Sequence, residues 1–153
     1  TQYSRMYAEY QQLPVEEVGD LLAWLDRAPT KLVVVVDPEA IADLRATLRE
    51  RLGDRVFLTT SLPYLLELGH PEVSKGTGIA FVAERLGLEA AEVVAFGDGE
   101  NDIELIEWAG FGMAVDDGHP LLLERADALV PGPEHDGVAE VIHAYLDRAA
   151  ASA

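Results

Sequence analysis

Residues 93–109 read VVAFGDGENDIELIEWA, and this stretch decides how the fold is interpreted. Its first four residues, 93–96, are apolar and predict a short buried strand. Gly97 ends that strand, and an apolar pattern with helical spacing begins at Ile103. The stretch therefore predicts a strand, a tight acidic turn and a helix. In an open α/β sheet such a turn lies at the carboxyl end of the strand, where these folds bind ligands.

The turn carries three carboxylates within five residues, from Asp98, Glu100 and Asp102. Oxygen ligands on a short turn suit Mg²⁺, which takes few protein carboxylates and keeps several waters. Carboxylates are also common at the start of a helix, because they interact favourably with its dipole, and the turn by itself leaves that reading open. An EF-hand loop is excluded because Ile103 stands where that loop needs glycine. The chain also contains no Walker phosphate loop.

The composition narrows the classes of partner. The chain has 153 residues, 49% of them hydrophobic, and a net charge of -17 from 28 acidic and 11 basic residues. This charge argues against nucleic acid and anionic membranes, which need a positive face. An anionic substrate stays compatible, because a bound Mg²⁺ and one lysine can invert the local field. With no cysteine, no membrane-length apolar run and no evident signal peptide, we expect a soluble cytoplasmic protein.

The first half of the chain predicts a small α+β unit. Residues 1–12 show no clear period and predict a loop, whereas Pro14 opens a helix that Pro29 ends. After these come, in order, a buried strand at 31–36, a helix that Asp37 caps, Pro38 opens and Gly53 closes, and an antiparallel pair of strands at 55–60 and 64–68. The apolar face of that helix is formed by Ile41, Leu44, Leu48 and Leu52.

The pattern changes near Gly69-His70-Pro71, and the second half predicts a parallel sheet with helices between its strands. The predicted strands are 93–96, 111–115 and 128–130, and the predicted helices are 75–86, 103–108, 120–126 and a final one around 138–146. Three strands are few for a doubly wound domain, which usually has five or six. We expect the missing strands to come from sequence before Thr1 or from another chain, and the absence of an initial methionine agrees with a truncated or processed product.

Residues 57–147 resemble the C-terminal part of the haloacid dehalogenase-like (HAD) phosphatases, in particular the Cof-type branch. The resemblance rests on four segments in the family's order and spacing. The first segment, Val73-Ser74-Lys75-Gly76, is similar to the family's lysine segment. The second, residues 96–102 (FGDGEND), is similar to its acidic metal motif. The last two, residues 109–114 (AGFGMA) and 136–138 (DGV), are similar to its downstream signatures. Residues 1–56 match only as a cap-like pattern.

The resemblance implies an α/β fold with part of an α+β cap at 1–69 and the C-terminal half of a Rossmann-like core at 70–153. It also implies Mg²⁺-dependent hydrolysis of a phosphate monoester through an aspartyl-phosphate, with a small metabolite or sugar phosphate as substrate. By position, Asp98 would ligate Mg²⁺ directly. Asp102 would be part of the metal site without contacting the ion directly, and it would orient Lys75. Lys75 would bridge the nucleophile and the phosphate, and Asn101 would hydrogen-bond a phosphate oxygen.

The family's nucleophile motif, Asp-x-Asp-Gly-Thr, has no counterpart in this chain. Asp37 follows a strand but lacks the second aspartate, and Asp116 and Asp117 are adjacent rather than two apart. We therefore expect a fragment that is inactive alone. Two other functions stay open: a non-enzymatic module that pairs through exposed strand edges, and a phosphotransferase or mutase of the same superfamily. The expected partners are a homodimer mate or a missing N-terminal segment.

Overall fold

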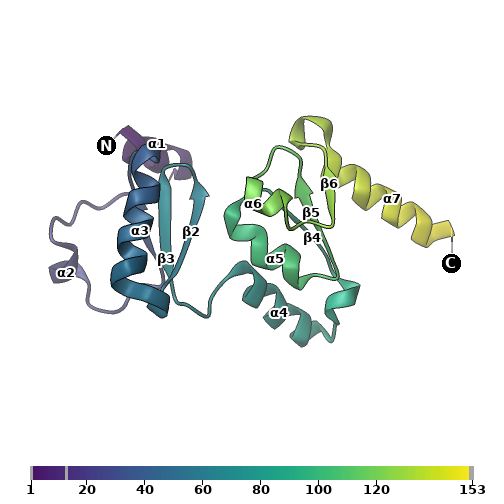
Figure 1. Ribbon diagram of the computed structural model, residues 1–153, viewed down its shortest axis with the longest axis horizontal. Coiled ribbons are helices and arrows are strands. Elements are labelled where there is room, and N and C mark those ends of the chain that lie inside the picture. The colour runs from purple at the N-terminus through teal and green to yellow at the C-terminus, as the bar shows by residue number, and fades with distance from the viewer. Residues whose placement is uncertain (1, 13, 152–153) are drawn as a thin grey trace. The chain divides into compact units, whose positions relative to one another are not determined.

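A computed structural model describes residues 2–12 and 14–151 of the chain. The chain divides into two compact units, 1–73 and 74–153, and each unit is described by itself (Figure 1). The observed division lies four residues after the boundary predicted at 69/70. The interpretation of the two parts as a partial cap and half of a core stays a prediction. Within the described residues, no helix is long and apolar enough to span a membrane.

The first unit contains a three-stranded antiparallel sheet in the order β1-β3-β2. Its strands are β1 (Leu32–Val35), β2 (Phe57–Leu62) and β3 (Leu65–Gly69), and a bulge lies between Thr60 and Leu62. The helix α3 (Ile41–Leu52) follows a short 3-10 turn at Pro38–Ala40. Gly53 ends α3 with a positive φ of 56°. The predicted strands, helix and antiparallel pair are therefore confirmed.

The N-terminal predictions are wrong in two places. Residues predicted as a loop form the helix α1 (Gln2–Gln11), whose Tyr3 ring stacks on Tyr64 with ring centroids 5.2 Å apart; Thr1 lies outside the described residues. A contact across 61 positions of sequence leaves no local signature. A helix was predicted between Pro14 and Pro29, but only the single helical turn α2 (Leu21–Trp24) forms. The Asp20 carboxylate accepts hydrogen bonds from two backbone amides of this turn. All four residues of this turn are exposed, so no packing extends it.

The second unit is a parallel sheet in the order β4-β5-β6, with helices between the strands, as predicted. Its strands are β4 (Val94–Gly97), β5 (Phe111–Val115) and β6 (Ala128–Val130). Its helices are α4 (Lys75–Leu86), α5 (Ile103–Trp108), α6 (Pro120–Leu123) and α7 (Gly137–Ala151). Short 3-10 turns lie at Ala90–Glu92, Glu100–Asp102 and Pro133–His135. Only α6 is clearly shorter than predicted.

A buried cluster of the second unit lies on one face of this sheet. Ala95 of β4 and Ala114 of β5 pack against Ile106 of α5 and Leu122 of α6, and all four are at most 5% exposed. Small residues on the strands let the two short helices approach the sheet closely. This packing places the turn after β4 and the start of α5 on a rigid base.

Helix α4 packs against α5 through a glycine. A Cβ built on Gly76 would lie 2.6 Å from the backbone oxygen of Glu104, much closer than any real contact. Gly78, only two residues further along the same helix, has nothing within 4 Å of its built Cβ. The absence of a side chain at residue 76 therefore sets the distance between α4 and α5, and with it the position of Lys75.

We expect Gly76→Ala to lower the free energy of unfolding by about 1–3 kcal/mol, because the added methyl must push two backbones apart. The matched variant Gly78→Ala should instead raise it by up to about 1 kcal/mol, since alanine is the better helix former. Urea unfolding followed by circular dichroism measures both. Similar effects of the two substitutions would contradict the close packing of α4 on α5.

Candidate active site

Asp102 is hydrogen-bonded to two other residues that the sequence analysis proposed for the site, Lys75 and Asp98. Its Oδ1 atom accepts a hydrogen bond from the Lys75 ammonium, and its Oδ2 atom accepts from the backbone amides of Asp98 at 3.1 Å and Gly99 at 3.0 Å. The Asp102 side chain is 5% exposed, whereas the Lys75 side chain is 47% exposed. One buried carboxylate therefore holds both the lysine and the start of the acidic turn.

The surroundings of Asp102 favour its charged form. Burial by itself would raise the pKa of the Asp102 carboxyl, because removal from water disfavours the charge. The hydrogen bond from Lys75, the hydrogen bonds from the Gly99 and Asp98 amides, and the positive charge of Lys75 all lower it. Together these contacts outweigh burial, so the pKa of Asp102 lies below its ordinary value. Asp102 is therefore an anion at neutral pH.

Gly97, the last residue of β4, makes this arrangement sterically possible. A Cβ built on Gly97 would lie 2.5 Å from Cβ of Asp102 and 3.0 Å from its Cγ. Only glycine lets the Asp102 side chain fold back under the turn and reach the amides of Asp98 and Gly99. The glycine that ended the strand in the sequence thus also makes room for the carboxylate.

The backbone of Asp98 is held on both sides while its side chain stays exposed. Its amide donates to Asp102 Oδ2, and its carbonyl accepts from the backbone amide of His119 at 2.7 Å. His119 follows β5, the strand next to β4. These two contacts fix the Cα of Asp98 at the carboxyl end of β4 and leave its carboxylate facing solvent.

Lys75 is placed by the start of α4. The Ser74 side chain accepts from the Thr77 amide at 3.2 Å, and the Thr77 hydroxyl accepts from the Ser74 amide at 2.9 Å. This capping box fixes where the helix begins. Lys75, the first residue of α4, therefore lies beside the turn after β4, and the lysine motif and the acidic motif meet in space although 27 positions separate them.

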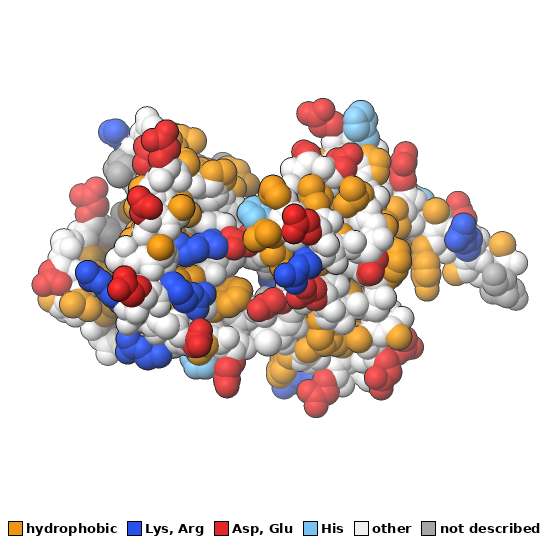
Figure 2. All heavy atoms as spheres, viewed as in Figure 1, with side chains coloured by type: hydrophobic (Ala, Val, Ile, Leu, Met, Phe, Trp, Pro, Cys, Tyr) orange, Lys and Arg blue, Asp and Glu red, His pale blue; other side chains and the backbone are white. Residues whose placement is uncertain are grey.

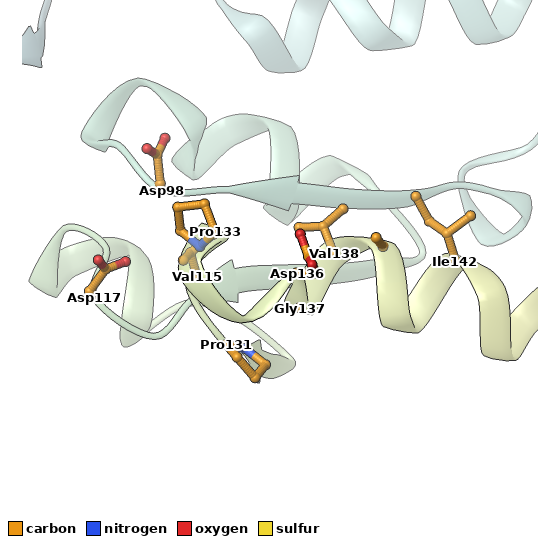
Figure 3. A pocket seen from close by; sticks show the side chains of 10 residues that line it. Asp98, Val115, Asp117, Pro131, Pro133, Asp136, Gly137, Val138 and Ile142 are labelled. Carbon is orange, nitrogen blue, oxygen red and sulfur yellow. The ribbon is translucent and has the colours of Figure 1, made fainter.

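The sequence interpretation named Asp117 and Asp136 but did not place them in the site with Asp98. A hollow of about 550 Å³ beside it is also lined by Asp117 and Asp136, with apolar walls that include Val138 and Ile142. Figure 3 shows Asp98 and Asp117 at one end of this hollow and Ile142 at the other. Asp117 follows β5, so its carboxyl-end position was the signal that could have identified it. Asn101 and Glu100 lie in the same turn as Asp98 and are partly buried.

Of the two aspartates predicted for the metal site, one has a carboxylate that a divalent cation could reach. Both oxygens of Asp102 are already occupied by hydrogen bonds, so only Asp98 of the two offers a solvent-facing carboxylate. Across 2–12 and 14–151, no three His, Asp or Glu side chains gather into a group that could hold a metal ion. Mg²⁺ is compatible with such a sparse site, because it is commonly held by one or two carboxylates, waters and substrate phosphate.

Comparison with known proteins gives matches to one family of hydrolases and to proteins named as phosphatases. A model of the haloacid dehalogenase-like hydrolase family matches residues 2–142. The protein named "Putative phosphatase YxeH" from Bacillus subtilis is 34% identical over 113 residues, which cover 74% of this chain and 42% of that protein. The phosphoglycolate phosphatase of Archaeoglobus fulgidus is 48% identical over 71 residues, which cover 46% of this chain and 32% of that protein.

A solved structure supports the same relationship. The crystal structure of a haloacid dehalogenase-like hydrolase from Bacteroides thetaiotaomicron matches with a TM-score of 0.76 at 28% identity, over 95% of this chain and 55% of that one. The present chain thus spans about half the length of the solved relative, and less than half of the two curated ones.

Replacing the central carboxylate tests this geometry. We expect Asp102→Asn to lower the free energy of unfolding near neutral pH by about 2 kcal/mol, because it removes charge-assisted hydrogen bonds to Lys75 and two amides. Since the pKa of Asp102 is lower in the folded than in the unfolded chain, its stabilisation is present above about pH 4 and is lost as the pH falls below that value. Urea unfolding of both proteins across this range should show their difference shrinking in acid.

The exposed ion pair between Arg125 and Glu107 provides the control. Their side chains are 57% and 42% exposed, so Glu107→Gln should change the stability little at any pH. An Asp102→Asn variant as stable as Glu107→Gln near neutral pH would contradict a central role for Asp102.

Proposed function

Because this chain belongs to the haloacid dehalogenase-like hydrolases, we propose that it forms the C-terminal portion of a Mg²⁺-dependent phosphatase that acts on a small phosphorylated metabolite. One observation carries this proposal: the Asp102 carboxylate ties the Lys75 ammonium to the turn that bears Asp98, at the carboxyl end of β4. The Lys75 ammonium and the exposed carboxylate of Asp98 are thereby held at the edge of the sheet where α/β folds bind ligands.

Each residue has a role in this proposal. Asp98 is the direct ligand that would hold Mg²⁺, and the bound ion would neutralise negative charge on the phosphoryl oxygens. Lys75 contacts the phosphate with its half-exposed ammonium and stabilises the charge that develops during transfer. Asp102 orients that ammonium. Asn101, in the same turn, donates a hydrogen bond to a phosphate oxygen.

The nucleophile comes from outside this chain. In the proposed reaction an aspartate attacks the phosphorus, forms an aspartyl-phosphate and releases the alcohol, and water then hydrolyses the acyl phosphate. The chain contains no Asp-x-Asp-Gly-Thr motif that would supply such an aspartate. Stabilising groups without a nucleophile leave the phosphoryl transfer undone, so the chain alone is inactive.

The substrate is a small phosphate monoester. The name of the Archaeoglobus relative makes phosphoglycolate the first compound to test, and sugar phosphates are the wider class. The negative charge of the whole chain does not oppose this choice, because charge near the reacting phosphate is set by Lys75 and the bound cation rather than by distant carboxylates.

Incubation of the chain with Mg²⁺ and phosphoglycolate should release no phosphate above the blank, measured as inorganic phosphate. Joining the chain to the part of the Bacteroides hydrolase that it does not cover should restore hydrolysis. In that joined protein Lys75→Ala should lower kcat by about 10²–10³-fold, because a positioned charge stabilising the transition state is removed. Lys75-dependent hydrolysis by the chain alone, or a joined protein insensitive to Lys75→Ala, would overturn the proposal.

A second variant tests the metal ligand. Asp98→Asn should leave the stability nearly unchanged, because the side chain is exposed and the backbone contacts of Asp98 remain. It should weaken Mg²⁺ binding, measured calorimetrically in the joined protein, by at least about tenfold, since a charged oxygen ligand is lost. Asp127→Asn, at an exposed carboxylate that accepts from the Gly112 amide, is the control and should bind Mg²⁺ normally.

A further inference from the structure

The two faces of the antiparallel sheet β1-β3-β2 in the first unit differ in character. Helix α3 lies on one face, where the Arg45 guanidinium donates a hydrogen bond to the Thr60 hydroxyl at 3.5 Å (Figure 1). Successive side chains of a strand point to opposite faces, so Thr59 lies on the other face. Thr59 pairs with Glu67 of β3, and Glu67 also pairs with Val33 of β1. The face away from α3 therefore has a carboxylate on its middle strand.

Side chains from both neighbouring strands hold the Glu67 carboxylate. Its Oε2 atom accepts a hydrogen bond from the Lys31 ammonium at 2.8 Å, and its Oε1 atom accepts from the Ser61 hydroxyl. Lys31 directly precedes β1, and Ser61 belongs to β2. The Glu67 side chain is 12% exposed, whereas that of Lys31 is 52% exposed. A mostly buried carboxylate thus fixes an ammonium group that water can still reach.

The chain has only two lysines, and both are held in this way. Lys75 donates to Asp102, whose side chain is 5% exposed, and Lys31 donates to Glu67. Figure 2 shows Lys and Arg side chains mostly over the first unit. Arg49 of that unit pairs at 3.6 Å with a fully exposed carboxylate, and such pairs contribute little because water and salt screen them. The buried partner of Lys31 instead restricts the ammonium to one place, as a preorganised binding group requires.

Thr59, which lies directly opposite Glu67, has a hydroxyl that the fold does not satisfy. The residue is 6% exposed, and its Oγ1 atom has no hydrogen-bond partner among the residues that the structure describes. Such a group lowers the stability of the fold, and folded proteins contain few of them. Polar groups that cost stability are typical of functional sites. Lys31, Thr59, Ser61 and Glu67, called the Glu67 cluster, therefore have the features of a binding site.

The chemistry of the Glu67 cluster selects the kind of ligand. The Lys31 ammonium has three N–H donors, of which one is directed at Glu67. A carboxylate can accept about four hydrogen bonds, so those from Lys31 and Ser61 do not saturate Glu67. A fixed donor beside a fixed acceptor matches two adjacent hydroxyl groups. Glu67 would repel an anion and Lys31 would repel a cation, so the pair favours a neutral ligand.

We propose that the Glu67 cluster binds a neutral vicinal diol, as found in a polyol or in the sugar part of a sugar phosphate. One hydroxyl of the diol donates to the Glu67 carboxylate, and the adjacent hydroxyl accepts from the Lys31 ammonium. Ser61 orients the carboxylate through its own hydrogen bond. All of these residues belong to the first unit, so the inference does not depend on the proposed phosphatase reaction.

Nuclear magnetic resonance of the isotope-labelled full chain measures this binding directly. The probe is myo-inositol, a ring of adjacent hydroxyls, and cyclohexanol, a ring of the same size with a single hydroxyl, is the matched control ligand. We expect myo-inositol to shift the amide signals of Thr59, Ser61 and Glu67 with a dissociation constant on the order of 10 mM, because few hydrogen bonds at a partly exposed site bind weakly. Cyclohexanol should leave these signals unchanged.

Substitutions in the first unit locate the binding site. Glu67→Gln and Lys31→Met should each weaken myo-inositol binding by at least about tenfold, because each removes a charge-assisted hydrogen bond to the diol. Lys31→Met should keep the fold, since its side chain is half exposed, and circular dichroism checks both variants. Asp54→Asn is the matched control: it removes a fully exposed carboxylate of the same unit outside the Glu67 cluster, and binding should not change.

Glucose and glucose 6-phosphate distinguish the two sources of the diol. Equal binding of both at the Glu67 cluster would assign it to free polyols, and tighter binding of the phosphate that still requires Glu67 and Lys31 would assign it to sugar phosphates. Myo-inositol that shifts no signal, or cyclohexanol that shifts the same signals, would overturn the inference. Binding that survives both Glu67→Gln and Lys31→Met would also overturn it. Phosphate release by the joined protein is measured separately, so its failure would contradict only the proposed function.

Discussion

The buried carboxylate of Asp102 is the interaction on which the site depends. It accepts three hydrogen bonds from two separate elements, α4 and the turn after β4. A carboxylate removed from water is costly unless such partners compensate it, so its position is strongly specified. Lys75 and the backbone of Asp98 are fixed as a consequence. The glycines at 76 and 97 make the arrangement possible, because each lies where a side chain would collide with it.

The fold places Asp102 and Asp98, two aspartates of the same turn, in different surroundings. Asp102 is buried and paired with Lys75, whereas the carboxylate of Asp98 points to solvent a few residues away. The pKa of Asp102 stays below its ordinary value although a second carboxylate is near in sequence, because Asp102 has a cation and two amide donors. An exposed carboxylate and a half-exposed ammonium that are held through the same buried aspartate suit a ligand that brings both positive and negative groups, such as a cation with a phosphate.

The second unit resembles half of a larger sheet in its physical properties as well as in its matches to relatives. On the side of α5 and α6 its buried residues are at most 5% exposed, whereas on the opposite face Val94 and Phe111 are 47% and 44% exposed, and among the described residues the outer edge of β4 pairs with no strand. Both kinds of surface are normally covered in folded α/β proteins. Among the described residues, β4 carries both the strand edge that pairs with no other strand and the turn with Asp98.

The sequence by itself determined most of the secondary structure and supplied the residues of the candidate site. The strands at β5 and β6 and the helices α4 and α5 were predicted to the residue or nearly so, because glycines, capping residues and apolar periodicity are local signals. Lys75, Asp98 and Asp102 were identified from motifs within the sequence. Local signals failed for α1, where Tyr3 packs on Tyr64, and for the segment around α2, which has no apolar surface to pack on.

Only the tertiary structure decided how these residues work together. It connected Lys75 to Asp102 across 27 positions, anchored the Asp98 carbonyl to His119, and brought Asp117 and Asp136 to the same hollow as Asp98. It also showed which strand edge has no partner among the described residues and which apolar side chains of the sheet are partly exposed. These features depend on distances between segments far apart in the chain, and such distances are set by packing and strand order, which leave no mark in a local pattern of residues.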